Sequence, residues 1–343
     1  MALLDERLRR RLANVRARLR PGAGGTLKAV APARSAPPAP DPEIVLKQQR
    51  EALGRLRQDD LAAADAGQLR SEFFALAKTF TPAVIADAKG IRYFVPTDDS
   101  FSRQLFVKQE RREMRLLARV QHGLEQLGID RGRRTLLDVG GNIGTGPVEA
   151  VCRQGFEHAI AFEPHPGNYA ICQINVILND AGDRVTLVNA AVADQEGSAT
   201  LQVSRHNSGA HSLSGADVGA IDAIEVPTVS FDGMAARGEL DPDSVSLLWM
   251  DIEGYEIHAL QGGRCLLERS VPFVMELNPP VLRAAGRADQ LLDTLAGRYT
   301  NVVNLRDFGK RLNTGALQPL DAIDGMLQDA EEKAMDILVC RLP

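Results

Sequence analysis

Short apolar runs alternate with helix-like stretches from residue 134 to the end of the chain. Five runs have the length and apolar density of buried strands: residues 135–139, 159–162, 185–188, 247–250 and 273–277. Helical patterns follow several of them, and repeated strand–helix units predict a parallel sheet with helices on both faces. Because ligands bind beyond the carboxyl ends of the strands in such sheets, functional residues are expected directly after each run.

The chain before residue 134 has a different texture. Residues 43–133 are mostly helical in periodicity, with one helix expected over 106–127 and one strand near 91–95. This part predicts a helical N-terminal cap on a sheet domain that spans residues 134–343.

The first 42 residues form a separate region. Residues 21–42 hold six prolines and three glycines, which is typical of an extended linker. Residues 1–20 have leucine or valine at steps of three or four among seven arginines, so a basic amphipathic helical arm is expected. Such an arm suits an anionic membrane surface or a protein partner, and a solvated terminus is the alternative.

Composition and charge exclude several classes. With 44% hydrophobic and 25% charged residues, the chain is neither collagen-like nor wholly disordered. The net charge of the whole chain is −5. Residues 1–20 carry a net charge of +5, so the other residues carry −10, and this acidic body argues against nucleic-acid binding. Four widely spaced cysteines indicate no disulfide framework or zinc site, and a cytoplasmic protein is expected. No run of 18 apolar residues and no secretory signal are present.

A glycine-rich loop follows the first predicted strand and contains Gly140, Gly141, Asn142 and Gly144. It matches neither the dinucleotide fingerprint nor the phosphate-binding P-loop. Asp138 precedes the first glycine by two residues, and its carboxylate would repel a pyrophosphate. An acid at that position suits a ligand with an ammonium group, such as the amino-acid part of S-adenosylmethionine (SAM).

An acid also ends the second predicted strand. Glu163 lies 19 residues after Gly144, and a carboxylate there can accept hydrogen bonds from two ribose hydroxyls. The loop alone could be an ordinary turn, and the acid alone a solvated strand end. Together, at this spacing, they predict a nucleoside cofactor.

Four segments in series resemble the FkbM family of SAM-dependent methyltransferases: residues 137–144, 161–166, 189–197 and 250–256. The resemblance covers about residues 134–277, and Gly141 is a mild departure, since alanine is more frequent there in the family. It implies an α/β, Rossmann-like class I methyltransferase sheet of seven strands, with residues 336–340 as an antiparallel last strand. It also implies SAM as cofactor and O-methylation of a sugar, polysaccharide or secondary metabolite as the reaction.

Further candidates follow the later strands. Asp194 comes after the third strand and either accepts a hydrogen bond from the adenine amine or belongs to a turn. His206 and His211 lie in a polar segment between two expected paired strands, 199–203 and 225–230. Because the reference pKa of histidine lies near neutrality, both are candidate bases, although a loop histidine is often merely solvated.

Asp251 ends the fourth predicted strand and is the first candidate for orienting or deprotonating an acceptor hydroxyl. A helix cap is its structural alternative. Asp251, Glu276 and Asn278 offer oxygen ligands for a divalent ion, but no compact acidic metal motif is visible and no metal is expected. Two other functions stay open: a non-catalytic module of the same fold, and an NAD-dependent oxidoreductase. The oligomeric state is not predicted.

Overall fold

The structure is a computed structural model, and it describes most of the chain after residue 41. The described residues are 42–55, 65–129, 131–204, 207–214, 220–284, 286–306, 316–328 and 334–343. The chain divides into two units, residues 1–46 and 47–343, and the fold described below is that of the second unit. Helix α2 (Pro42–Arg55) spans the boundary, and the predicted arm and nearly all of the linker lie outside the described residues.

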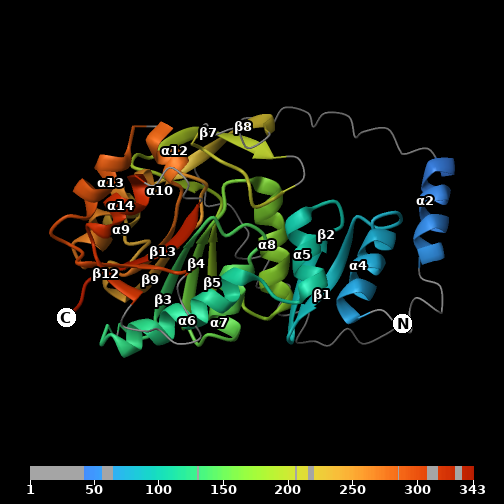
Figure 1. Ribbon diagram of the computed structural model, residues 1–343, viewed down its shortest axis with the longest axis horizontal. Helices are drawn as coiled ribbons and strands as arrows, with labels where there is room; N and C mark the ends of the chain where they lie inside the picture. Colours follow the sequence, from blue (N-terminus) through green and yellow to red (C-terminus); the bar gives the residue numbers. More distant parts are fainter. Residues whose placement is uncertain are drawn as a thin grey trace. The chain divides into compact units, whose positions relative to one another are not determined.

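A mixed eight-stranded sheet forms the centre of the second unit (Figure 1). Its order is β12-β11-β13-β10-β9-β3-β4-β5. The strands are β3 (Thr135–Val139), β4 (His158–Phe162), β5 (Val185–Val188), β9 (Val245–Met250), β10 (Phe273–Leu277), β11 (Asn301–Asn304), β12 (Leu317–Pro319) and β13 (Met335–Cys340). The five predicted strands are confirmed and run parallel, and the predicted last strand is β13, antiparallel to β10. The expectation of seven strands was wrong by one, because β12 pairs with the outer edge of β11.

Successive side chains on the central strands point to opposite faces of the sheet and belong to two hydrophobic cores. Leu136 and Trp249 belong to the core beneath α6–α8, whereas Leu137 and Leu248 belong to the core beneath α9–α14. Burial on both faces makes these strands continuous apolar runs rather than alternating ones. The covering helices are α6 (Arg112–Gln126), α7 (Thr145–Cys152), α8 (Pro166–Leu178), α9 (Phe231–Ala236), α10 (Glu256–Gln261), α11 (Arg264–Leu267), α12 (Pro279–Ala284), α13 (Ala288–Leu295) and α14 (Ala322–Gln328).

The N-terminal part of the unit contains helices and a hairpin. Its elements are α4 (Ala66–Ala77), β1 (Ala83–Ala88), β2 (Ile91–Pro96) and α5 (Ser100–Lys108), followed by α6. The predicted strand near 91–95 is β2, and its antiparallel partner β1 was not predicted. The single helix expected over 106–127 was wrong: Gln109 has a left-handed backbone with φ of 53°, which ends α5 before α6 begins. Figure 1 shows the hairpin beside α8, and α5 packs against the hairpin.

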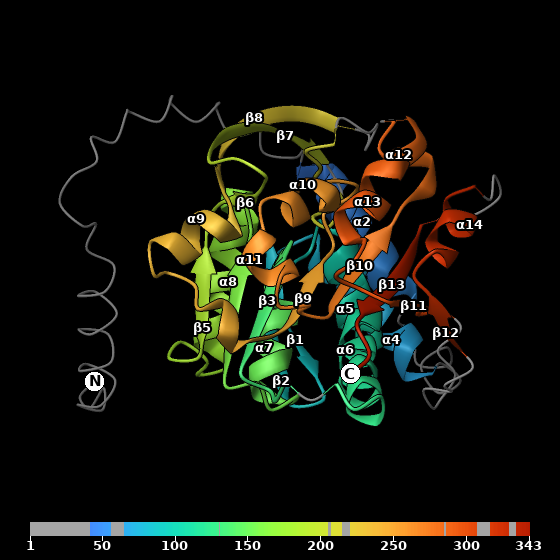
Figure 2. The same ribbon diagram turned by 90° about the vertical axis from the view of Figure 1, so that its left-hand side faces the viewer.

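A smaller three-stranded sheet is inserted between β5 and β9. It consists of β6 (Ala191–Val192), β7 (Gly197–Ser204) and β8 (Ala220–Val229), and Figure 2 shows β7 and β8 at one end of the main sheet. The predicted pairing of 199–203 with 225–230 is confirmed, since Ala199 pairs antiparallel with Val226. In the described part of the chain, no helix has the length and apolar character to cross a membrane.

Candidate active site

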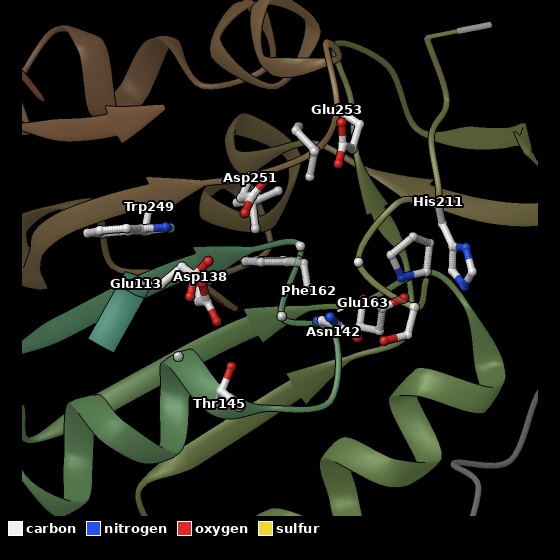
Figure 3. Close-up of a pocket in the computed structure, with 18 of the residues that line it drawn as sticks. Glu113, Asp138, Asn142, Thr145, Phe162, Glu163, His211, Trp249, Asp251 and Glu253 are labelled. Atoms are coloured by element: carbon white, nitrogen blue, oxygen red, sulfur yellow. Dashed lines mark hydrogen bonds between the residues drawn. The ribbon is translucent and has the colours of Figure 1, made fainter. Parts of the chain in front are cut away.

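A pocket lies at the carboxyl ends of β3, β4 and β9, where the sequence pattern placed it. Figure 3 shows Asn142, Glu163 and His211 together at one end, and Asp138 at the other. Asp251 lies between the two ends, and its carboxylate faces the pocket. The sheet topology brings these side chains together because all three strands point the same way.

Two glycines allow the pocket to form. Gly140 has φ of +89°, and a Cβ there would overlap the carbonyl oxygen of Asp251 in the neighbouring loop. Gly146 lies in the first turn of α7, and a Cβ there would collide with the carboxylate of Asp138. The glycines therefore let the β3 loop, the β9 loop and the Asp138 side chain pack without intervening side chains.

Asp138 is buried in the wall of the pocket, with 6% of its surface exposed. Burial raises its pKa to about 7, because the charged carboxylate loses hydration. A cation beside this group would favour the charged form. Asp138 is therefore suited to an ammonium-bearing ligand, as its sequence position predicted.

Glu163 accepts hydrogen bonds from the backbone N–H of Asn142 at 2.8 Å and of His165 at 2.8 Å. Burial raises its pKa to about 8 despite these two bonds, which favour the charged form. Beside these two bonds and the nearby Asn168 amide, the carboxylate keeps a lone-pair direction for a ligand hydroxyl. The two backbone donors fix the orientation of the carboxylate at the pocket.

The side-chain amide of Asn142 is the clearest indication that the pocket accepts a polar ligand. Asn142 is 8% exposed and lines the pocket, with a left-handed φ of 48°. Neither its Oδ1 nor its Nδ2 has a hydrogen-bond partner among the described residues. A buried amide without partners costs about 1–3 kcal/mol, and a polar ligand in the pocket would remove that cost. The residues present thus fit a nucleoside cofactor with hydroxyl and amine groups.

Three carboxylates form an acidic cluster in the same pocket. Asp251, Glu253 and Glu276 bring carboxylate oxygens within 4.8 Å of one another. The Asp251 side chain is open to the pocket, but protein encloses it on the other sides, and this burial together with the charge of Glu276 raises its pKa well above the ordinary value. Asn278, the third oxygen ligand that the sequence offers, instead accepts a hydrogen bond from the N–H of Val281 in α12.

Glu256 holds the loop that carries the acidic cluster. It is buried, and its Oε1 accepts from the N–H groups of Ile252 at 3.2 Å and Gly254 at 3.3 Å. Burial raises its pKa to about 8. The sequence pattern does not predict this contact, because it forms between the first residue of α10 and the loop after β9.

The two candidate histidines have different outcomes. His206 lies outside the described residues. His211 lines the pocket, packs against the ring of His165 at 4.5 Å, and has a pKa lowered to about 4 by burial and by His165. Its Nδ1 accepts from the N–H of Ser204 at 3.1 Å, so the neutral ring carries its proton on Nε2. In this arrangement His211 offers a donor to the pocket rather than a free base.

Two predicted cofactor residues do not line the pocket. Gly144 is the N-cap of α7, and its φ of +87° places it against Cys172, where a Cβ would not fit. Asp194 instead lies 3.2 Å from Nδ1 of His258, which also contacts Arg287. Gly144 therefore shapes the loop from behind, and Asp194 belongs to a separate polar contact.

Sequence reasoning missed the pocket residues supplied by the N-terminal part of the chain. Phe101, Arg111 and Glu113 line the pocket from α5, α6 and the junction between them. Arg111 makes two hydrogen bonds of 3.1 Å to the Glu113 carboxylate and lies over the Phe101 ring at 3.6 Å. No motif could reveal them, because only the packing of α5 and α6 on the sheet brings them to the site.

The strand order, the antiparallel β13 and the acids at the ends of β3 and β4 define a class I methyltransferase. The model of the methyltransferase FkbM domain matches residues 138–311, just over half of the chain. The chain therefore belongs to the FkbM methyltransferase family, as its motifs predicted. No curated protein matches the sequence.

Several solved structures are similar to this chain at low identity. A proposed rRNA methylase from Clostridium thermocellum has a TM-score of 0.36 at 11% identity and covers 65% of this chain and 95% of its own. A proposed transferase from Pyrococcus horikoshii has a TM-score of 0.35 at 10% identity and covers 76% and 72%. The precorrin-6Y C5,15-methyltransferase from Geobacter metallireducens has a TM-score of 0.32 at 11% identity and covers 64% and 86%. Likenesses of this size carry no argument about the reaction.

Proposed function

We propose that the protein transfers a methyl group from SAM to a hydroxyl oxygen of a sugar, polysaccharide or secondary metabolite. The observation that carries the proposal is the unpartnered, buried amide of Asn142, which lies in one pocket with Asp138 and Glu163. Membership of a methyltransferase family supports methyl transfer, and the acids suit the amine and the ribose of this cofactor.

Each residue has a distinct part in this proposal. Asp138 and the loop of Gly140, Gly141 and Asn142 hold the methionine part, and Glu163 holds the ribose hydroxyls. When bound, SAM supplies an electrophilic methyl group on a positively charged sulfur. Gly144 acts only through the shape of the loop.

Asp251 is the proposed catalytic residue. Its carboxylate is open to the pocket, and burial by the surrounding protein together with the neighbouring acids raises its pKa and so its affinity for a proton. It can therefore orient an acceptor hydroxyl and receive its proton as the oxygen is methylated. His211 is the weaker candidate, because its Nδ1 lone pair is engaged by Ser204. His206 remains a prediction.

Binding of S-adenosylhomocysteine (SAH) tests the cofactor assignment. Isothermal titration with the full chain is expected to show binding, and Glu163→Gln is expected to weaken it by roughly ten-fold, since leaving a buried polar group without its hydrogen-bond partner costs about 1–3 kcal/mol. Glu157→Gln is the matched control, because Glu157 is exposed just before β4. Absence of SAH binding by the wild-type protein would contradict the proposal.

Activity assays with the same protein distinguish the proposed function from its alternatives. Methyl transfer from labelled SAM into extracts of the source cell supports the enzyme, whereas binding without transfer favours a non-catalytic module. A nicotinamide-dependent absorbance change would favour an oxidoreductase, which family membership disfavours. A membrane or protein partner for residues 1–20 remains a prediction, because those residues lie outside the described part of the chain.

A further inference from the structure

Residues 207–214, here called the strap, connect β7 to the region before β8 and border the pocket. Asn207, Ser208 and Gly209 all line it. A Cβ on Gly209 would lie 3.4 Å from Nδ2 of Asn142 and 3.3 Å from the ring of Phe101. The strap therefore lies directly against the amide that faces the proposed cofactor.

Asp99, a buried carboxylate in the N-terminal part of the chain, accepts hydrogen bonds from the strap. Asp99 is 9% exposed. Its Oδ1 accepts from the N–H of Ser208 at 2.8 Å, and its Oδ2 accepts from the Ser208 hydroxyl at 3.1 Å. Oδ2 also accepts from the N–H of Ser102 at 2.7 Å, which caps α5. A helix cap needs only the last of these bonds, so the two bonds to Ser208 serve a purpose beyond capping.

The strap is held from the opposite side by α8. The side chain of Asn168 donates from Nδ2 to the carbonyl oxygen of Ser208 at 2.9 Å. The backbone N–H of Asn168 donates to Nδ1 of His165, and the backbone N–H of His165 donates to the carboxylate of Glu163. Ser208 is thus joined through consecutive hydrogen bonds to the carboxylate proposed to bind the ribose.

Asp99 lies outside residues 138–311, which match the family model. The family domain alone therefore does not contain the group that fixes the strap. Three hydrogen bonds on one serine, from two elements on either side, give this segment one defined position beside Asn142.

We propose that Asp99 is a positioning residue that, through Ser208, holds the strap against the cofactor side of the pocket and slows cofactor release. This role rests on the proposed function, because it concerns the same cofactor. It assigns the N-terminal part of the chain a function in cofactor retention, in addition to packing on the sheet.

The test compares SAH dissociation rates for the full-length wild-type protein, Asp99→Asn and Ser208→Ala by stopped-flow fluorescence. Trp249, the only tryptophan of the chain, lines the pocket and reports on occupancy. Asparagine can still cap α5 through its side-chain oxygen, but its NH₂ group cannot accept from Ser208. Asp98→Asn is the matched control, because Asp98 is adjacent and exposed.

Both variants are expected to release SAH about ten-fold faster than wild type, as the loss of a hydrogen bond to a charged group predicts. The double variant is expected to be faster than either single variant but slower than the product of their effects, because the two changes remove different hydrogen bonds of one contact between Asp99 and Ser208. Asp98→Asn is expected to match wild type.

Dissociation rates equal to wild type in both variants would overturn the role of Asp99 while leaving SAM binding intact. Additive effects would also overturn it, because Asp99 would then act through α5 rather than through Ser208. Should the wild-type protein fail to bind SAH, both this role and the proposed function are refuted. Thermal unfolding of each variant identifies any change that comes from loss of the fold.

Discussion

Asp138 has a pKa of about 7 because burial destabilises its charged form, so its protonation state changes within the physiological range. An ammonium group on a ligand favours the ionised carboxylate. SAH retains that ammonium group, so its binding should require ionised Asp138. Since acid protonates the group, affinity for SAH should fall as the pH decreases.

We expect the dissociation constant of SAH to rise about ten-fold from pH 8 to pH 6, as linkage to one group with this pKa requires. Isothermal titration across this range measures the change. Asp138→Asn should bind weakly at both pH values with little dependence on pH. A full pH dependence in that variant would assign the proton to another carboxyl, such as Glu163.

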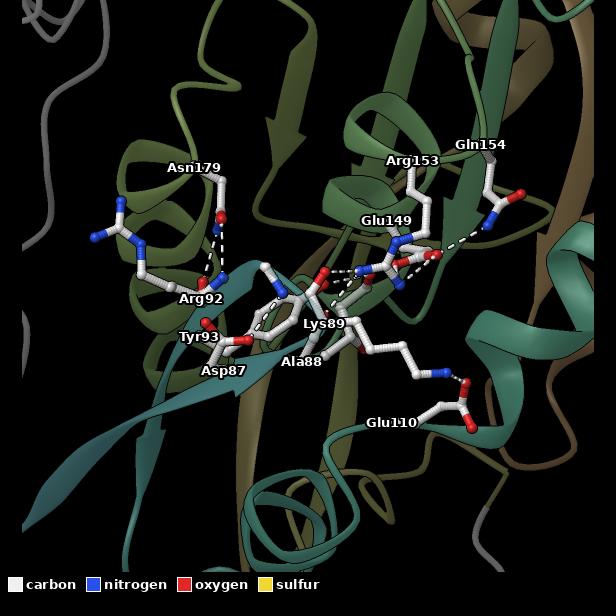
Figure 4. A network of polar contacts seen from close by, with 12 residues as sticks. Asp87, Ala88, Lys89, Arg92, Tyr93, Glu110, Glu149, Arg153, Gln154 and Asn179 are labelled. Atoms are coloured by element: carbon white, nitrogen blue, oxygen red, sulfur yellow. Dashed lines mark hydrogen bonds and ion pairs between the residues drawn. The ribbon is translucent and has the colours of Figure 1, made fainter.

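At the scale of elements, the hairpin β1–β2 is fixed to the sheet domain by polar side chains from α8 and from the end of α7 (Figure 4). Asn175 and Asn179, one helical turn apart on α8, each exchange two hydrogen bonds with the backbone of β2, at Phe94 and Arg92. The two amides take the place of a neighbouring strand along this edge of the hairpin.

Arg153 ties the hairpin turn to α7 and the pocket wall. It donates to the carbonyl oxygens of Ala88 at 2.8 Å and Lys89 at 3.0 Å, and it pairs with Glu149 at 3.0 Å. Glu149 is 1% exposed and lines the pocket. Gln154 adds a second bond to the Glu149 carboxylate at 2.8 Å.

Replacement of Arg153 by methionine should lower the free energy of unfolding by about 2 kcal/mol, because a buried carboxylate loses its cation. Chemical denaturation of the full chain measures the loss. Arg115→Met is the control: it removes an ion pair to Glu110 in which Arg115 is 58% exposed, and it should cost under about 0.5 kcal/mol. Equal losses in the two variants would contradict the role assigned to Arg153 at the hairpin.

Two strands in the middle of the sheet, residues 135–139 and 273–277, are predicted to the residue, because a short continuous apolar run is typical of a strand covered on both faces. The edge strand β5 is also predicted to the residue, although it is only partly buried. β1 was missed because its outward face exposes Ile85 and its inward face holds alanines, so its pattern is weak. The break at Gln109 carries neither glycine nor proline to mark it.

The same distinction applies to the site. Asp138, Glu163 and Asp251 could be predicted, because each follows a strand and parallel strands end at one edge. The contact of Asp99 with Ser208 and the place of Glu113 in the pocket could not be predicted, because both depend on how α5 and α6 pack. The local sequence pattern predicts the strands of the sheet and the edge where they end. It does not predict contacts between segments that are distant in the sequence, because these depend on the packing of the folded chain.

At the scale of the whole molecule, buried acids make stability depend on pH. Asp138, Glu163 and Glu256 have pKa values raised to about 7, 8 and 8, whereas in the unfolded chain they ionise near pH 4. The folded protein therefore binds more protons than the unfolded chain above pH 4. Under that condition the free energy of unfolding decreases as the pH rises, until the pH exceeds the folded-state pKa values.

Histidines oppose this trend only at lower pH. The pKa values of His165, His211 and His258 are lowered by burial, so the unfolded chain binds more protons at these sites when the pH is below about 6.5. The exposed acids with lowered pKa values, Glu239 and Asp243, are ionised in both states above pH 6. Between pH 6.5 and 8 the buried acids therefore determine the slope.

We expect the free energy of unfolding of the ligand-free protein to fall by about 4 kcal/mol or more from pH 6.5 to pH 8, as proton linkage for carboxyls with these pKa values predicts. Glu256→Gln should reduce this slope by roughly a third, since one of the buried carboxyls with a raised pKa (Asp138, Glu163, Asp251 and Glu256) no longer titrates, whereas Glu157→Gln should leave it unchanged. Urea denaturation at both pH values gives the two free energies. A stability that is constant or rises over this range would mean that the three carboxyls are already ionised in the folded protein, and the pH dependence expected for SAH binding at Asp138 would then disappear as well.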